Sequence, residues 1–143
     1  MAATLLIVDD SRTVRTLARQ VCLGRGWNWH EAANVAEGLR LASRESIDLV
    51  LLDTTLRGLH PLDALHAFRD QLRSRDTPIL LLAPSLGQGS LPLSLRAQAQ
   101  GVLAKPFSHS ALGHAAGLWL AGSSIVHAPA CTRSLATAAA DAK

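Results

Sequence analysis

Three aspartates and one lysine of this chain have the types and the spacing along the sequence that could carry out chemistry together. Asp9 and Asp10 follow one short apolar run, Asp53 ends a second, and Lys105 ends a third. Clustered carboxylates repel one another, and a hard divalent cation such as Mg²⁺ relieves that repulsion through oxygen ligands. Asp53 is also a nucleophile of the type that forms aspartyl phosphates, and a lysine across from it would neutralise phosphoryl oxygens. The residue types therefore predict metal-assisted phosphoryl chemistry.

The four residues meet only if the apolar runs before them are parallel strands. The run between Asp48 and Asp53 is rich in branched side chains and too short for a helix, which predicts a strand buried on both faces. Strands of that kind belong to parallel sheets, and ligands gather at their carboxyl ends. Acids at strand ends are often only solvated loop residues. Four such residues at matching strand ends are a far more specific pattern, and we interpret them as a site.

The rest of the chain alternates strand and helix patterns five times with short connections. This alternation predicts a doubly wound α/β fold, with a parallel sheet covered by helices on both faces. Ser11, Asn34 and Ser108 are candidate helix N-caps. We expect strands at 4–9, 27–32, 47–53, 79–83 and 102–105, and helices at about 12–24, 35–42, 62–72, 93–100 and 109–120.

Length and composition favour a single globular domain. The chain has 143 residues, 48% of them apolar, and a net charge of +3 carried mostly by scattered arginines. We expect a domain at 1–121, followed by a flexible segment at 122–143 that is rich in Ala, Ser and Thr. No apolar run approaches the roughly 20 residues that span a bilayer, and no secretory signal is expected. Cys22 and Cys131 lack metal-ligand spacing, so reduced thiols and a cytoplasmic location are predicted.

The combined motifs resemble those of two-component response-regulator receiver domains of the chemotaxis-regulator type. The matching stretches are Ile7-Val8-Asp9-Asp10-Ser11, Asp48-Leu49-Val50-Leu51-Leu52-Asp53 and Lys105-Pro106-Phe107, and the likeness covers about 1–121. The resemblance implies a flavodoxin-like, five-stranded sheet in the order 2-1-3-4-5. It also implies signalling by phosphorylation rather than an enzymatic activity on a separate substrate.

The same resemblance implies a role for each site residue. Asp53 would accept a phosphoryl group from the phosphohistidine of a histidine kinase or histidine phosphotransfer protein. Asp10 would bind Mg²⁺ directly and Asp9 directly or through water, and the backbone carbonyl of Thr55 would complete the site. Lys105 would contact the phosphoryl oxygens. A cis peptide bond before Pro106 is a further expectation, since cis bonds in proteins occur almost only before proline.

Two positions depart from the family pattern. Receivers usually have Thr or Ser at the end of the fourth strand and an aromatic residue three positions before the lysine, where this chain has Ala83 and Val102. A hydrogen bond to a charged group is worth about 1.5–3 kcal/mol. A switch from 1% to 99% active needs roughly 5.5 kcal/mol. We therefore predict normal phosphoryl chemistry at Asp53 but a weakened relay of the signal through residues 83 and 102. Ser85 is not expected to supply the missing hydroxyl group, because it follows Pro84.

Several functional alternatives stay open. The chain is interpreted as a single-domain regulator that acts through a downstream protein partner, because 22 residues after the domain cannot hold a DNA-binding or enzymatic output domain. Direct nucleic-acid binding and membrane insertion are not expected, and a homodimer is left open. The main alternative is a pseudo-receiver that binds partners independently of phosphorylation. A hydrolase using Asp53 is disfavoured because no residue stands out as its general acid.

Overall fold

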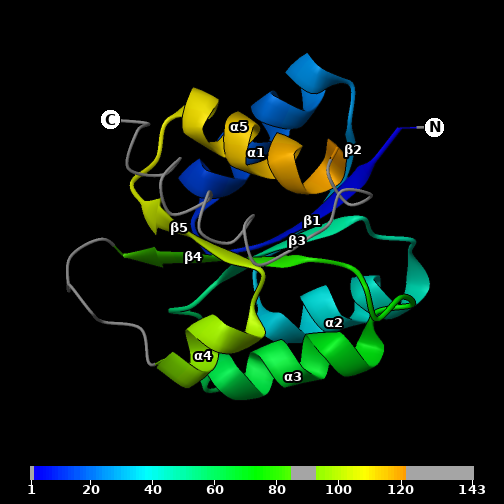
Figure 1. Ribbon diagram of the computed structural model, residues 1–143, viewed down its shortest axis with the longest axis vertical. Helices are drawn as coiled ribbons and strands as arrows, with labels where there is room; N and C mark the ends of the chain where they lie inside the picture. The colour runs from blue at the N-terminus through cyan, green and yellow to red at the C-terminus, as the bar shows by residue number, and fades with distance from the viewer. Residues whose placement is uncertain (1, 85–92, 122–143) are drawn as a thin grey trace.

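The computed structural model describes residues 2–84 and 93–121 as an alternation of strands and helices (Figure 1). The predicted segment 122–143, Ser85 and the rest of 85–92 lie outside the described residues. The elements in chain order are β1 (Thr4–Val8), α1 (Arg12–Arg25), β2 (Asn28–Ala32), α2 (Val35–Arg44), β3 (Leu49–Asp53), α3 (Pro61–Gln71), β4 (Ile79–Pro84), α4 (Leu93–Gln98), β5 (Gly101–Lys105) and α5 (His109–Ala121).

The strands form one parallel sheet in the order β2-β1-β3-β4-β5. This confirms the predicted fold class and strand order. Helices α1 and α5 cover one face of the sheet, and α2, α3 and α4 cover the other (Figure 1). Because every strand runs in the same direction, the carboxyl ends of β1, β3 and β5 lie along the same edge. That edge carries the residues singled out from the sequence.

Each face of the sheet has its own apolar core, set by the alternation of side chains along the strands. In β1, Leu6 and Val8 point toward the α2–α4 side, while Leu5 and Ile7 point toward α1 and α5. Phe68 of α3 is completely buried in the first core. The central strands are apolar on both faces, as expected for a sheet covered on both sides.

The helices α1, α2 and α5 begin at the residues that the sequence suggested as caps. Ser11 Oγ accepts a hydrogen bond from the backbone N–H of Val14, and Asn34 Oδ1 accepts one from Glu37. Ser108 Oγ accepts from the N–H of Ala111. These bonds satisfy backbone donors that the first turn of a helix leaves unpaired.

Some boundaries differ from the expected ones for local reasons. Helix α4 ends at Gln98, two residues before the expected end at Gln100. The backbone N–H of Gln100 instead donates to the Ile79 carbonyl at 3.0 Å, which draws the chain into the sheet. Strand β3 begins at Leu49 rather than at residue 47, and the carboxylate of the preceding Asp48 accepts the backbone N–H of Thr4 at the start of β1. Among the described residues, no helix is both long and apolar enough to cross a membrane.

Candidate functional site

Asp9, Asp10 and Asp53 come together at the carboxyl ends of β1 and β3. One carboxylate oxygen from each residue lies within 4.8 Å of the others. Asp9 is fully buried and Asp53 is 3% exposed, whereas Asp10 is exposed to solvent. The sequence predicted this convergence, and the geometry places all three side chains where it expected them.

Lys105 joins the cluster from the end of β5. Its Nζ lies 2.8 Å from Asp9 Oδ2 and 3.2 Å from Asp53 Oδ1, so one ammonium group contacts two carboxylates. The Lys105–Pro106 peptide bond is cis, as the sequence suggested. The lysine side chain is 21% exposed and therefore stays accessible at the mouth of the site.

Burial and charge act against each other on the ionisable groups. Burial raises the pKa of Asp9, and the nearby charge of Asp53 acts in the same direction. The contacts of Asp9 with Lys105 and with the N–H of Ser11 oppose this increase without cancelling it. Burial alone would lower the pKa of Lys105, but the two carboxylates outweigh it and the pKa is raised. Lys105 therefore remains charged, while ionising the Asp9 carboxyl group costs more free energy in the folded protein than in the unfolded chain.

The N–H, carboxylate and carbonyl groups of Asp9 each form a hydrogen bond with a neighbouring residue. Its N–H donates to the Ala32 carbonyl at 3.0 Å, and its Oδ1 accepts from the N–H of Ser11 at 2.9 Å. The guanidinium of Arg15 donates to the Asp9 carbonyl at 2.8 Å. The contact of Arg15 is one that sequence reasoning missed. The only available signal was the arginine spacing along the first helix, which says nothing about a backbone acceptor.

Thr55 contacts Asp53 through its side chain. Its hydroxyl lies 2.9 Å from Asp53 Oδ1 and 3.1 Å from Oδ2, and its N–H donates to Oδ1 at 3.1 Å. Sequence reasoning assigned Thr55 a role through its backbone carbonyl only. The hydroxyl contact follows from the sharp turn after β3, which folds residue 55 back over the carboxylate two positions earlier. Thr55 thus orients the Asp53 carboxylate.

The donor set fits a hard divalent cation. Three carboxylates provide only oxygen ligands, which Mg²⁺ prefers over nitrogen and sulfur. Within residues 2–84 and 93–121 this is the one group of three or more acidic, His or Cys side chains close enough together to hold an ion. The exposed position of Asp10 leaves one side of the cluster open to solvent, from which an ion can enter.

The two unusual positions lie in neighbouring strands. Ala83 of β4 is 3% exposed and pairs in register with Ala104 of β5. Val102 is partly buried and packs against the core on the α2–α4 side. Neither side chain carries a hydrogen-bonding group or an aromatic ring, so neither can take the part that the usual residues play at these positions.

Comparison with known proteins agrees with this geometry. The family model of the response regulator receiver domain matches residues 5–116. A curated relative, the autoinducer 1 sensor kinase/phosphatase LuxN of Vibrio campbellii, is 30% identical over 117 residues, which are 82% of this chain but 13% of the relative. The chain likewise spans less than half of transcriptional regulators such as CpxR of Escherichia coli, at 43% of its length.

Two solved structures illustrate the likeness in three dimensions. The chemotaxis response regulator CheY4 of Vibrio cholerae has a TM-score of 0.75 and 26% identity, with coverage of 84% of this chain and 100% of that one. The receiver domain of the sensor histidine kinase PA1611 of Pseudomonas aeruginosa has a TM-score of 0.74 and 26% identity, with coverage of 85% and 99%. In that structure a magnesium ion is coordinated in the active-site cleft. The fold, the acidic cluster and the family match together show that this chain belongs to the response-regulator receiver domain family.

Proposed function

We propose that this domain accepts a phosphoryl group on Asp53 and passes the signal on by protein–protein contact. The donor is the phosphohistidine of a histidine kinase or of a histidine phosphotransfer protein. The observation that carries the proposal is the contact of one ammonium group with two clustered carboxylates: Lys105 Nζ lies 2.8 Å from Asp9 and 3.2 Å from Asp53. Membership of the receiver family supports it.

In the transfer step, a carboxylate oxygen of Asp53 attacks the phosphorus of the donor. A phosphorus–oxygen bond forms, the phosphorus–nitrogen bond to histidine breaks, and the imidazole leaves with the electron pair and takes up a proton. Lys105 can follow the negative charge from the carboxylate to the phosphoryl oxygens without leaving the site. Thr55 releases the carboxylate oxygen that forms the new bond and keeps its partner oriented.

The residues that would hold Mg²⁺ are Asp9, Asp10 and Asp53, together with the backbone carbonyl of Thr55. When bound there, the ion supplies positive charge that offsets the carboxylates and the incoming phosphoryl group. Asp10 is the most accessible ligand, and Asp9 is the most constrained because its carbonyl, N–H and carboxylate all have partners.

In this function the domain is cytoplasmic, and the signal from a phosphorylated Asp53 passes only weakly through the fold. Ala83 offers no hydroxyl to a phosphorylated Asp53, and Val102 has no ring to reorient in response. Output therefore depends on surfaces near the site, where a partner reads the phosphoryl group directly. We propose that residues 1–121 form one domain, which acts as a monomer or as a homodimer. The domain has no separate substrate, does not bind nucleic acid and does not insert into a membrane.

The test is phosphorylation by a small donor. The protein is incubated with acetyl phosphate with and without Mg²⁺, beside Asp53→Asn and Asp10→Asn variants, and the modified peptide is identified by mass spectrometry. We expect Mg²⁺-dependent modification of Asp53, none in Asp53→Asn and a large loss in Asp10→Asn. Modification at another residue, or none with Mg²⁺ present, would contradict the proposal.

The second candidate is a phosphorylation-independent interaction module, which the side chains of Ala83 and Val102 favour. The two functions separate in a partner pulldown using wild type, Asp53→Asn and a sample treated with beryllofluoride. Partner binding that responds to beryllofluoride and is lost in Asp53→Asn supports the phosphoacceptor function. Binding of equal strength in all three samples supports the constitutive module.

A further inference from the structure

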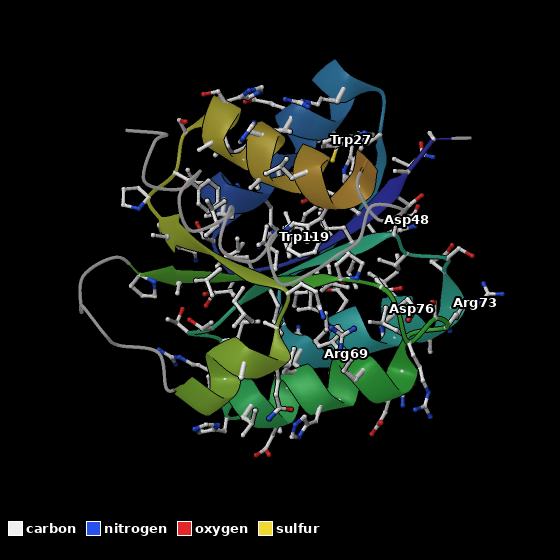
Figure 2. All side chains as sticks on the ribbon, in the orientation of Figure 1. Trp27, Asp48, Arg69, Arg73, Asp76 and Trp119 are labelled. Carbon is white, nitrogen blue, oxygen red and sulfur yellow. The ribbon has the colours of Figure 1, made fainter. Side chains whose placement is uncertain are left out.

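Arg15 of α1 connects the backbone of Asp9 to the edge strand of the sheet. Its guanidinium Nη1 donates to the Asp9 carbonyl at 2.8 Å, and its Nε lies 3.5 Å from Oε1 of Glu31 in β2. Helix α1 covers the face of the sheet on which Figure 2 shows Trp27 and Trp119. The Arg15 side chain is 19% exposed. One half-buried guanidinium therefore joins β2 to the carboxyl end of β1.

Glu31 is a fixed end of this connection. Its carboxylate accepts a hydrogen bond from Nε of Arg19 at 3.0 Å and another from the indole N–H of Trp29 at 3.1 Å. The next residue of β2, Ala32, accepts the backbone N–H of Asp9 at 3.0 Å. Strand β2 therefore acts on Asp9 by two routes, directly from the Ala32 carbonyl and from Glu31 through the helix.

The carbonyl that Arg15 holds belongs to the peptide group between Asp9 and Asp10. A peptide group is planar, so its orientation sets the direction in which the chain continues. Asp10 is exposed, and no hydrogen bond or ion pair joins its carboxylate to another of the described residues, so its position depends on the backbone. One carboxylate oxygen from each of these acids lies within 4.8 Å of the other and of Asp53. Holding this peptide group therefore holds the two neighbouring acids in their relative positions.

We propose that Arg15, anchored by Glu31, is a positioning residue that orients the peptide between Asp9 and Asp10 so that both acids can share one Mg²⁺ ion. The inference rests on the proposed function, in which these acids hold the ion. The positive charge of Arg15 by itself opposes a nearby cation, but the Glu31 carboxylate beside it offsets that charge. The net contribution of Arg15 is therefore the hydrogen bond to the carbonyl.

The chain offers a matched control in Arg19. Both arginines extend from α1 and pair with Glu31, but of the two Arg15 alone also contacts Asp9. Arg15→Met and Arg19→Met each remove one guanidinium and one partner of Glu31, and each keeps an unbranched side chain in the helix. If the ion pairs only stabilise the fold, the two variants should bind Mg²⁺ alike. The positioning role predicts that they differ.

The first measurement is a titration of the full chain with Mg²⁺, followed through the NMR amide signals near Asp53. Groups that hold metal ligands in place typically account for about 10- to 100-fold in metal affinity. Because Arg15 acts on the backbone of a ligand residue, we expect Arg15→Met to raise the Mg²⁺ dissociation constant about tenfold, at the lower end of this range. Arg19→Met should change it by less than about twofold, since this pair is exposed.

A charge-balanced double variant separates position from charge. Arg15→Met combined with Glu31→Gln removes one positive and one negative charge, so the net charge beside the site is that of the wild type. We expect the double variant to bind Mg²⁺ as weakly as Arg15→Met alone, because the hydrogen bond to the Asp9 carbonyl is absent from both.

The second measurement needs no metal. The amide N–H of Asp10 belongs to the same peptide group as the Asp9 carbonyl, so its nitrogen chemical shift in EDTA responds to the loss of a donor to that carbonyl. Arg15→Met should move this signal, and Arg19→Met should leave it in place. The indole N–H of Trp29 donates to Glu31 and should stay protected from solvent exchange in both variants, which checks that the fold around β2 is intact.

Three results would overturn the positioning role. One is a Mg²⁺ affinity of Arg15→Met equal to or higher than that of the wild type. Another is an equal loss of affinity in Arg15→Met and Arg19→Met. The third is recovery of wild-type affinity in the double variant, which would assign the effect to charge. A wild-type protein that does not bind Mg²⁺ would contradict the proposed function as well. If the wild type binds Mg²⁺ and Arg15→Met binds it equally, the proposed function stands and only the positioning role is wrong.

Discussion

The ammonium nitrogen of Lys105 lies 2.8 Å from Oδ2 of Asp9, a carboxylate with no exposed surface. The same ammonium group also contacts Asp53. A buried charge is tolerated when it is paired, and removal of one partner leaves the other uncompensated. The lysine therefore has a structural role at Asp9 in addition to its proposed role toward phosphoryl oxygens, and the two roles can be measured separately.

Replacement of Lys105 by Met keeps the apolar stem and removes the charge. Asp9 then loses its cationic partner, and we expect a loss of about 1–3 kcal/mol in the free energy of unfolding, at the lower end because the lysine is partly exposed. Urea denaturation with EDTA measures this loss. Mg²⁺ should stabilise Lys105→Met more than wild type at the same concentration, because the ion replaces the missing positive charge. Equal Mg²⁺ stabilisation in both proteins would show that Lys105 and the ion do not share Asp9. Lys105→Arg is the charge-preserving control.

Asp9→Asn should stabilise the protein at neutral pH without Mg²⁺. The pKa of Asp9 is raised above its ordinary value of 3.8 mainly by burial, so the folded protein binds a proton more readily than the unfolded chain. The cost of ionising Asp9 is thus absent below 3.8, grows as the pH rises through the folded pKa and is full above it. Thermal denaturation over a pH series should show a gain for Asp9→Asn that shrinks in acid. A gain independent of pH would contradict this explanation.

Glu31→Gln should have the opposite pH dependence. Burial acts to raise the pKa of Glu31, but contacts with Arg19, Trp29 and Arg15 outweigh it, and the pKa is lowered from its ordinary value of 4.5. The stabilising contribution of Glu31 is therefore present above 4.5 and is lost as the pH falls through the folded pKa. We expect Glu31→Gln to cost up to about 1 kcal/mol at neutral pH, because the pairs are partly exposed. The same thermal pH series measures it, and wild type and variant should converge in acid.

Gly38→Ala in α2 should destabilise the fold. A Cβ at this position would lie 2.9 Å from Phe68 Cζ and 3.0 Å from Val8 Cγ2, in the core between α2 and the sheet. Overpacking typically costs 1–3 kcal/mol, about the same as or more than the roughly 1 kcal/mol gained in helix propensity. Gly24→Ala in α1 is the matched control, since its Cβ would meet nothing within 4 Å. Denaturant titration should show a loss for Gly38→Ala and a gain for Gly24→Ala, and a gain at both positions would refute the packing argument.

A hydroxyl group at residue 83 and an aromatic ring at residue 102 should strengthen the transmission of the signal from Asp53 to β5 and α4. In wild type, beryllofluoride with Mg²⁺ should change the amide signals of residues near Asp53 while those of β5 and α4 shift little. Ala83→Thr provides a hydroxyl worth about 1.5–3 kcal/mol toward a charged group, and Val102→Tyr provides a ring. The double variant should show larger amide shifts at 93–107 than wild type. Large shifts there in the wild type would eliminate the weak-relay interpretation.

Local patterns in the sequence were sufficient to predict the helices and strands and to predict which acidic and basic side chains meet at one edge of the sheet. Apolar runs of strand length and helix caps are short-range properties, and the direction of parallel strands places their last residues on one edge. The sequence therefore predicted the doubly wound sheet, the cluster of Asp9, Asp10 and Asp53, and the arrival of Lys105. The strand order 2-1-3-4-5 came from the resemblance to receiver domains.

Only the tertiary structure decided which atoms meet. Lys105 contacts Asp9 more closely than Asp53, the Thr55 hydroxyl contacts Asp53, and Arg15 donates to the Asp9 carbonyl. These contacts depend on side-chain rotamers and on turns that are packed by distant segments. The same holds for Trp119 of α5, which packs into the core with Leu5 of β1 and Leu80 of β4. Spacing along a chain says which side chains can approach one another. The competition among neighbours for each donor and acceptor is settled only when all segments are packed together.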